Sequence, residues 1–92
     1  MFNFPSYYST YVLDTLPLHD IRTYTVIGKD YELNFASAQE NPKSIQFEIN
    51  QEVLPNLKEG DFRNLNSGGT LWIKRIYPIN NTYYVTFYLG SR

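Results

Sequence analysis

The sequence predicts a small all-β domain, because strand-like patterns recur along most of its length. Residues 45–49 alternate between apolar and polar side chains, as a strand does when one face is buried and the other is in water. Residues 70–89 form two long aromatic-rich runs joined by a turn at residues 78–81. No segment combines helical apolar spacing with the length that a stable helix needs. We therefore expect a small, partly open antiparallel β-barrel of SH3-like or OB-like size, or alternatively a two-sheet β-sandwich.

The 92 residues are enough for one domain. Residues 1–20 are the least regular part, since Pro5 and Pro17 limit a stretch of strand-like composition on both sides. We expect residues 1–20 to form an N-terminal arm or edge strand, which either packs on its own domain or reaches a neighbouring chain. Residues 21–92 are expected to form the barrel domain.

The middle of the chain is expected to contain short strands separated by turns. Residues 21–27 and 31–35 are predicted to pair as a hairpin, with a loop of about three residues in which Gly28 supplies a positive φ. Residues 36–40 allow at most one helical turn before the Asn41-Pro42 pair. Beyond it we expect a strand at residues 44–50 and a polar connection at residues 51–60. A short strand at residues 62–65 and a flexible turn at residues 66–69 are expected to follow.

The closing hairpin is expected to divide its side chains between a core face and an outward face. The more apolar set, predicted to lie in the core, is Leu71, Ile73, Tyr83, Val85, Phe87 and Leu89. The set predicted to point outward is Trp72, Lys74, Tyr84, Thr86 and Tyr88.

Composition and charge disfavour several classes of function. There is no cysteine and His19 is the single histidine, so a tetrahedral zinc site is close to excluded and no cofactor is implied. The formal charge is −1 and the densest basic cluster is Lys74-Arg75, which disfavours a polyanion partner and an acidic lipid surface. The first residues have no signal-peptide pattern, and no window is long enough to cross a bilayer. We therefore expect a soluble protein without a membrane partner.

Candidate catalytic groups are few. His19 beside Asp20 resembles an oriented base, but sequence neighbours on an extended segment seldom face one site. Glu32 and Glu48 both fall on polar strand faces, where glutamates are routine, although a carboxylate pair is also what a glycosidase needs. The glycine-rich residues 66–70 precede a strand, whereas a phosphate-binding loop precedes a helix. We expect a protein that is not an enzyme.

The aromatic content is the strongest functional signal. Nine Tyr, six Phe and one Trp are more large rings than a chain of this size is expected to bury. Outward rings on the closing hairpin can serve as cross-strand packing, as a protein contact or as a platform for bases. The predicted partner-binding residues are Trp72, Lys74, Tyr84, Tyr88, Phe2, Phe4, Tyr7 and Tyr8.

We expect a non-enzymatic protein-interaction module, either a subunit of a larger assembly or a small inhibitor that docks through exposed aromatics. The alternative is an OB-type single-stranded nucleic-acid-binding protein, with Lys74 and Arg75 along the backbone. A small hydrolase is the third hypothesis. Frequent Asn, Tyr, Ile and Lys are typical of AT-rich genomes, so a phage or mobile-element origin, and a cytoplasmic or virion location, are expected.

Overall fold

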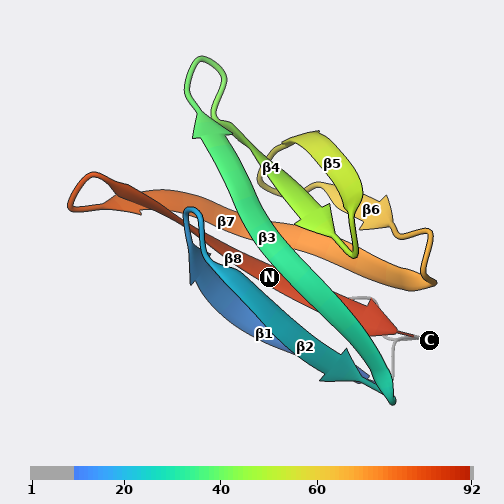
Figure 1. Ribbon diagram of the computed structural model, residues 1–92. Coiled ribbons are helices and arrows are strands. Elements are labelled where there is room, and N and C mark those ends of the chain that lie inside the picture. Colours follow the sequence, from blue (N-terminus) through green and yellow to red (C-terminus); the bar gives the residue numbers. More distant parts are fainter. Residues whose placement is uncertain (1–9, 92) are drawn as a thin grey trace.

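The computed structural model describes residues 10–91, which form eight β-strands and no helix (Figure 1). The first sheet is antiparallel and consists, in spatial order, of β1 (Thr10–Pro17), β8 (Thr82–Ser91), β7 (Gly69–Ile79) and β6 (Phe62–Asn64). The second, also antiparallel, consists of β2 (Ile21–Val26), β3 (Lys29–Gln39), β4 (Ser44–Ile49) and β5 (Glu52–Leu57). The predicted all-β antiparallel fold is confirmed.

The two sheets pack face to face around an apolar core. Phe47 of the second sheet makes edge-to-face contacts with Phe35 on its own sheet and with Phe87 on the first, at centroid distances of 5.6 and 5.7 Å. In the described residues, ladder pairing joins β1 only to β8 and β2 only to β3. The sheets are thus not closed into a barrel, and the structure takes the predicted alternative, the two-sheet sandwich.

The first two strands lie beside each other in different sheets. The chain crosses between the sheets at residues 18–20, where Leu18 N–H donates to the Tyr83 carbonyl and His19 N–H donates to the Phe35 carbonyl. Among the described residues, β1 is an edge strand of the first sheet. Residues 1–9 of the predicted arm lie outside the described residues.

Two-residue turns with positive φ at both positions join three of the described hairpins. They are Ile27-Gly28, Asn50-Gln51 and Asn80-Asn81, with φ between 49° and 69°. This is the type I′ geometry, whose twist matches that of paired strands. The first loop is shorter than predicted, because Lys29 already pairs with Val26.

Ile27 is the residue least suited to its turn. A β-branched side chain at φ 49° is strained, and its isoleucine side chain is exposed. We expect Ile27→Asn to raise the free energy of unfolding by about 1 kcal/mol, because Asn tolerates the left-handed region. Urea denaturation measures the change. Ile21→Asn, at an equally exposed strand position, is the matched control, and an equal gain there would contradict the turn-strain explanation.

Irregular pairing accounts for two further differences from the prediction. Residues 36–39 continue β3 through a bulge between Phe35 and Ser37, so no helical turn forms there. The predicted polar connection contains β5, whose Leu54 and Leu57 are both buried. These leucines are three residues apart, and a register shift opposite residues 45–47 lets both reach the core.

Candidate interaction surface

The outer face of the first sheet carries a continuous row of large side chains. Leu13, Tyr88, Trp72 and Phe62 pair directly across β1, β8, β7 and β6. The alternate positions, such as Leu71 and Phe87, are fully buried between the sheets. The row, called here the aromatic row, therefore lies on the face turned away from the second sheet. This is the side on which Trp72 and Tyr88 were predicted.

The rings of the aromatic row stack on one another. Phe62 and Trp72 are separated by 5.9 Å between centroids with an interplanar angle of 7°, and Trp72 and Tyr88 by 4.9 Å with 16°. Tyr11 adds a tilted contact with Tyr88 at 5.4 Å. These separations are close to the spacing between neighbouring strands. The rings therefore stand side by side across the sheet, with their faces against each other and their edges pointing outward.

The prediction overestimated the exposure of the central rings. Trp72 is 2% exposed and Tyr88 is 9% exposed, so both are buried although they lie on the outer face. Stacking accounts for part of this burial, since each ring covers its neighbour's face. The exposed apolar side chains are at the ends of the row, where Leu13 is 48%, Tyr11 49% and Phe62 37% exposed.

A bulge in β7 places two cations on the same face. The register shifts between Ile73 and Arg75, so that Lys74 and Arg75 are both exposed while Ile73 and Ile76 are both buried. The Lys74 Nζ lies 5.8 Å from the Tyr88 ring centroid. Lys74 therefore projects outward as predicted, and Arg75 joins it.

Two charged side chains from two other loops, Lys43 and Glu59, bond to the backbone beside the bulge. Just after the bulge, the Ile76 N–H donates to Glu59 Oε2 at 2.7 Å, and Lys43 Nζ donates to the Ile76 carbonyl at 2.8 Å. Lys43 and Glu59 also form an ion pair of 3.5 Å. Both the N–H and the carbonyl of Ile76, next to the bulge, thus have side-chain partners.

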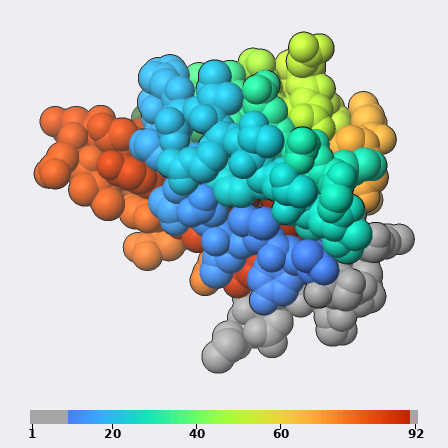
Figure 2. Space-filling model, turned by 60° about the horizontal axis from the view of Figure 1, so that its bottom comes forward, coloured from blue at the N-terminus to red at the C-terminus, as the bar shows by residue number. Residues whose placement is uncertain are grey.

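The end of the β7–β8 hairpin projects beyond its neighbours. Pairing of β1 with β8 ends at Pro17 and Tyr84, and β6 pairs only with the start of β7. Figures 1 and 2 show this end, in orange and red at the left, extending past the other strands. We call residues 77–84 the hairpin arm. At its base Tyr77 stacks on Tyr84 at 6.0 Å and 19°, and the Arg75 guanidinium lies 4.8 Å from the Tyr77 ring centroid.

The remaining predicted partner-binding residues divide into two groups. Tyr84 lies on the predicted face, half-buried at the base of the hairpin arm. Phe2, Phe4, Tyr7 and Tyr8 lie outside the described residues, so their predicted role stays a prediction.

The outer face of the second sheet is mainly polar, with Ile21 and Val53 exposed on it, and it carries the carboxylates considered for catalysis. Glu32 pairs with Thr23, and Glu48 pairs with Asn34 and Val53. This register makes Glu32 and Glu48 diagonal neighbours on one outward face. The second catalytic hypothesis pairs His19 with Asp20. In the structure the Asp20 carboxylate accepts a hydrogen bond from Arg22 at 2.8 Å.

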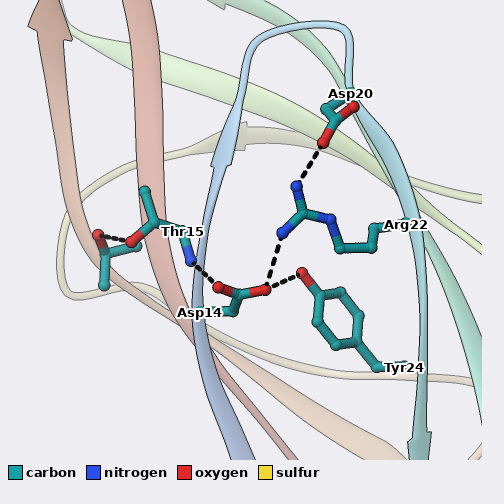
Figure 3. Close-up of polar contacts among 6 residues, drawn as sticks. Asp14, Thr15, Asp20, Arg22 and Tyr24 are labelled. Carbon is teal, nitrogen blue, oxygen red and sulfur yellow. Dashed lines mark hydrogen bonds and ion pairs between the residues drawn. The ribbon is translucent and has the colours of Figure 1, made fainter.

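A polar network closes the seam between β1 and β2 (Figure 3). Asp14 Oδ2 accepts hydrogen bonds from the Tyr24 hydroxyl at 2.6 Å and from Arg22 Nη1 at 3.1 Å, while its Oδ1 accepts from the Thr15 N–H at 2.8 Å. Burial raises the pKa of Asp14, but these hydrogen bonds and the guanidinium charge outweigh it and hold that pKa below its usual value. Burial and the bond to Asp14 raise the pKa of Tyr24, so its hydroxyl remains a donor.

The lowered pKa of Asp14 predicts an acid-sensitive seam. A carboxylate whose folded-state pKa is depressed contributes its full stability above its unfolded pKa of about 3.9, and loses it as pH falls through the folded-state value. We expect Asp14→Asn to lower the free energy of unfolding by on the order of 1 kcal/mol near neutral pH, with a smaller loss at acid pH. Urea denaturation of both proteins at a series of pH values from about 2 to about 7 measures this difference in the free energy of unfolding. Asp20→Asn is the control, because it removes only the exposed ion pair with Arg22. An equal loss of stability in this variant would contradict a special contribution of the Asp14 hydrogen bonds.

Comparisons with protein-family models, with curated proteins and with solved structures found no match to this chain. Among the described residues, no helix is long and apolar enough to span a bilayer.

Proposed function

We propose that this protein is a non-enzymatic protein-interaction domain that contacts its partner through the outer face of the first sheet. The observation that carries the proposal is the difference between the two outer faces. One presents the ends of the aromatic row and two exposed cations. The described residues of the other present mainly threonine, asparagine, glutamine and carboxylate side chains, with Ile21 and Val53 exposed among them and no aromatic ring.

Aromatic and arginine side chains supply most of the binding energy at protein interfaces. Arg75, Tyr77 and Tyr84 form such a group at the base of the hairpin arm, where the Tyr77 ring contacts the Arg75 guanidinium and also stacks on Tyr84. Preformed ring contacts leave little side-chain freedom to lose on binding, which favours this group as an anchor. The exposed Ile79 adds apolar area nearby.

The stacking geometry favours a protein partner over single-stranded nucleic acid. Base stacking needs an available ring face, whereas Trp72 uses its faces for Phe62 and Tyr88. We expect no binding of a fluorescent single-stranded oligonucleotide at about 50 mM salt, where phosphate contacts are strong. Fluorescence anisotropy measures this. Salt-sensitive binding that Lys74→Glu abolishes would contradict the proposal and restore the nucleic-acid alternative.

A photo-crosslinking experiment tests the proposed face. With p-benzoylphenylalanine at Tyr77, in cells that naturally produce the protein, irradiation is expected to give a covalent adduct with one protein. The same amino acid at Glu40, in the exposed β3–β4 turn, is the control. The purified partner should bind the wild-type chain and bind Arg75→Glu at least about tenfold more weakly. Absence of an adduct from Tyr77, or equal yields at both positions, would refute the proposal.

The setting of this domain is also part of the proposal. We place it in a larger assembly, of the kind that phages and mobile elements encode, in the cytoplasm or in a virion. Support comes from residue composition alone.

A further inference from the structure

Charge is divided unevenly along the chain. Residues 1–61 contain all nine acidic side chains and four basic ones, which gives a formal charge of −5. Residues 62–92 contain four basic side chains and no acidic one, which gives +4. The small net charge of −1 therefore conceals two oppositely charged halves.

The fold places this division on opposite sides of the sandwich. The described outward positions of the first sheet include Lys74 and Arg75 and no carboxylate. The described outward positions of the second sheet include Asp30, Glu32 and Glu48 and no Lys or Arg. We call the latter the acidic face. Because the two faces point in opposite directions, the molecule has a basic side and an acidic side.

The charges on these faces are not neutralised within the described chain. Asp14, Asp20, Glu59 and Asp61 each form an ion pair. Glu32, Glu48 and Asp30 form no ion pair with any described residue, and the Asp30 carboxylate accepts a hydrogen bond from the neutral Thr25 hydroxyl. Lys74 and Arg75 likewise contact rings and no described carboxylate. Unpaired charges of opposite sign are thus available on the two sides.

We propose that the partner is a second copy of this chain, whose acidic face receives the Lys74, Arg75 and Tyr77 side of the first. This inference rests on the proposed function and names the occupant of its face. The contact joins different surfaces of the two copies, so each copy keeps one face of each kind. Such head-to-tail contacts continue into rings or filaments. Arg75 and Lys74 would pair with Glu32 and Glu48, and the hairpin-arm rings would cover the threonines of β2.

Charge-reversal variants test the proposal with the purified full-length chain. Sedimentation velocity should show the mass of the wild type rising with concentration at low salt and returning to the monomer at about 1 M salt. Lys74→Glu/Arg75→Glu makes both faces acidic, and Glu32→Lys/Glu48→Lys makes both basic. Each variant alone is expected to remain monomeric with an unchanged circular dichroism spectrum. Mixing them restores complementary faces, so the mixture should assemble.

Lys58→Glu, an exposed residue outside both faces, is the matched control and should assemble like the wild type. A wild-type chain that stays monomeric up to about 0.5 mM at low salt would overturn the inference, since specific contacts hold well below that concentration. Assembly that both charge-reversal variants retain would also overturn it. If the chain is monomeric but the Tyr77 crosslink yields a different protein, the proposed function stands and only the second copy is refuted.

Discussion

Replacing Phe47 with alanine is expected to lower the free energy of unfolding by about 3–5 kcal/mol, which is a large part of the stability of a domain of this size. Phe47 is fully buried and contacts Phe35 and Phe87, so it joins the two sheets. Its removal leaves a cavity that rigid paired strands cannot close. Urea denaturation followed by circular dichroism measures the loss.

Phe47→Leu is the control for this prediction, because leucine keeps most of the apolar volume at that position. It should cost much less than the alanine variant. A loss below about 1 kcal/mol for Phe47→Ala would mean that the sheets do not pack as described.

Replacing Trp72 with alanine is expected to cost about 3 kcal/mol, although the residue lies on an outer face. Trp72 is buried and stacks on both Phe62 and Tyr88, so the substitution opens a gap in the middle of the aromatic row. Trp72→Phe keeps a ring between its neighbours and should lose less than half as much. Circular dichroism is the suitable probe, since the chain has a single tryptophan. An equal loss in both variants would contradict the stacking explanation.

Regular strands were predictable because alternation and burial follow the same period of two. Ile45, Phe47 and Ile49 alternate in the sequence and are all buried in the structure. The division of the closing hairpin was predictable for the same reason, since Val85 and Phe87 lie in the core. The turn at residues 50–51 was harder to find, because it contains neither glycine nor proline.

Bulges limited the prediction, because each adds one residue and reverses the alternation beyond it. Ile73 and Ile76 are three residues apart and both buried, a spacing that could have indicated the bulge at Lys74. The separation of acidic residues in 1–61 from the basic segment 62–92 was visible in the sequence, but the net charge of −1 hides it. The seam around Asp14 depends on how two strands of different sheets align, which local sequence does not determine.

The projecting hairpin arm has a consequence for uncontrolled aggregation. Strands without lateral neighbours offer backbone groups to which other chains can add, and proline interrupts such addition. Pro78 lies in the arm, Pro17 ends edge strand β1, and Pro55 interrupts edge strand β5. Growth by strand addition is thereby disfavoured at these margins.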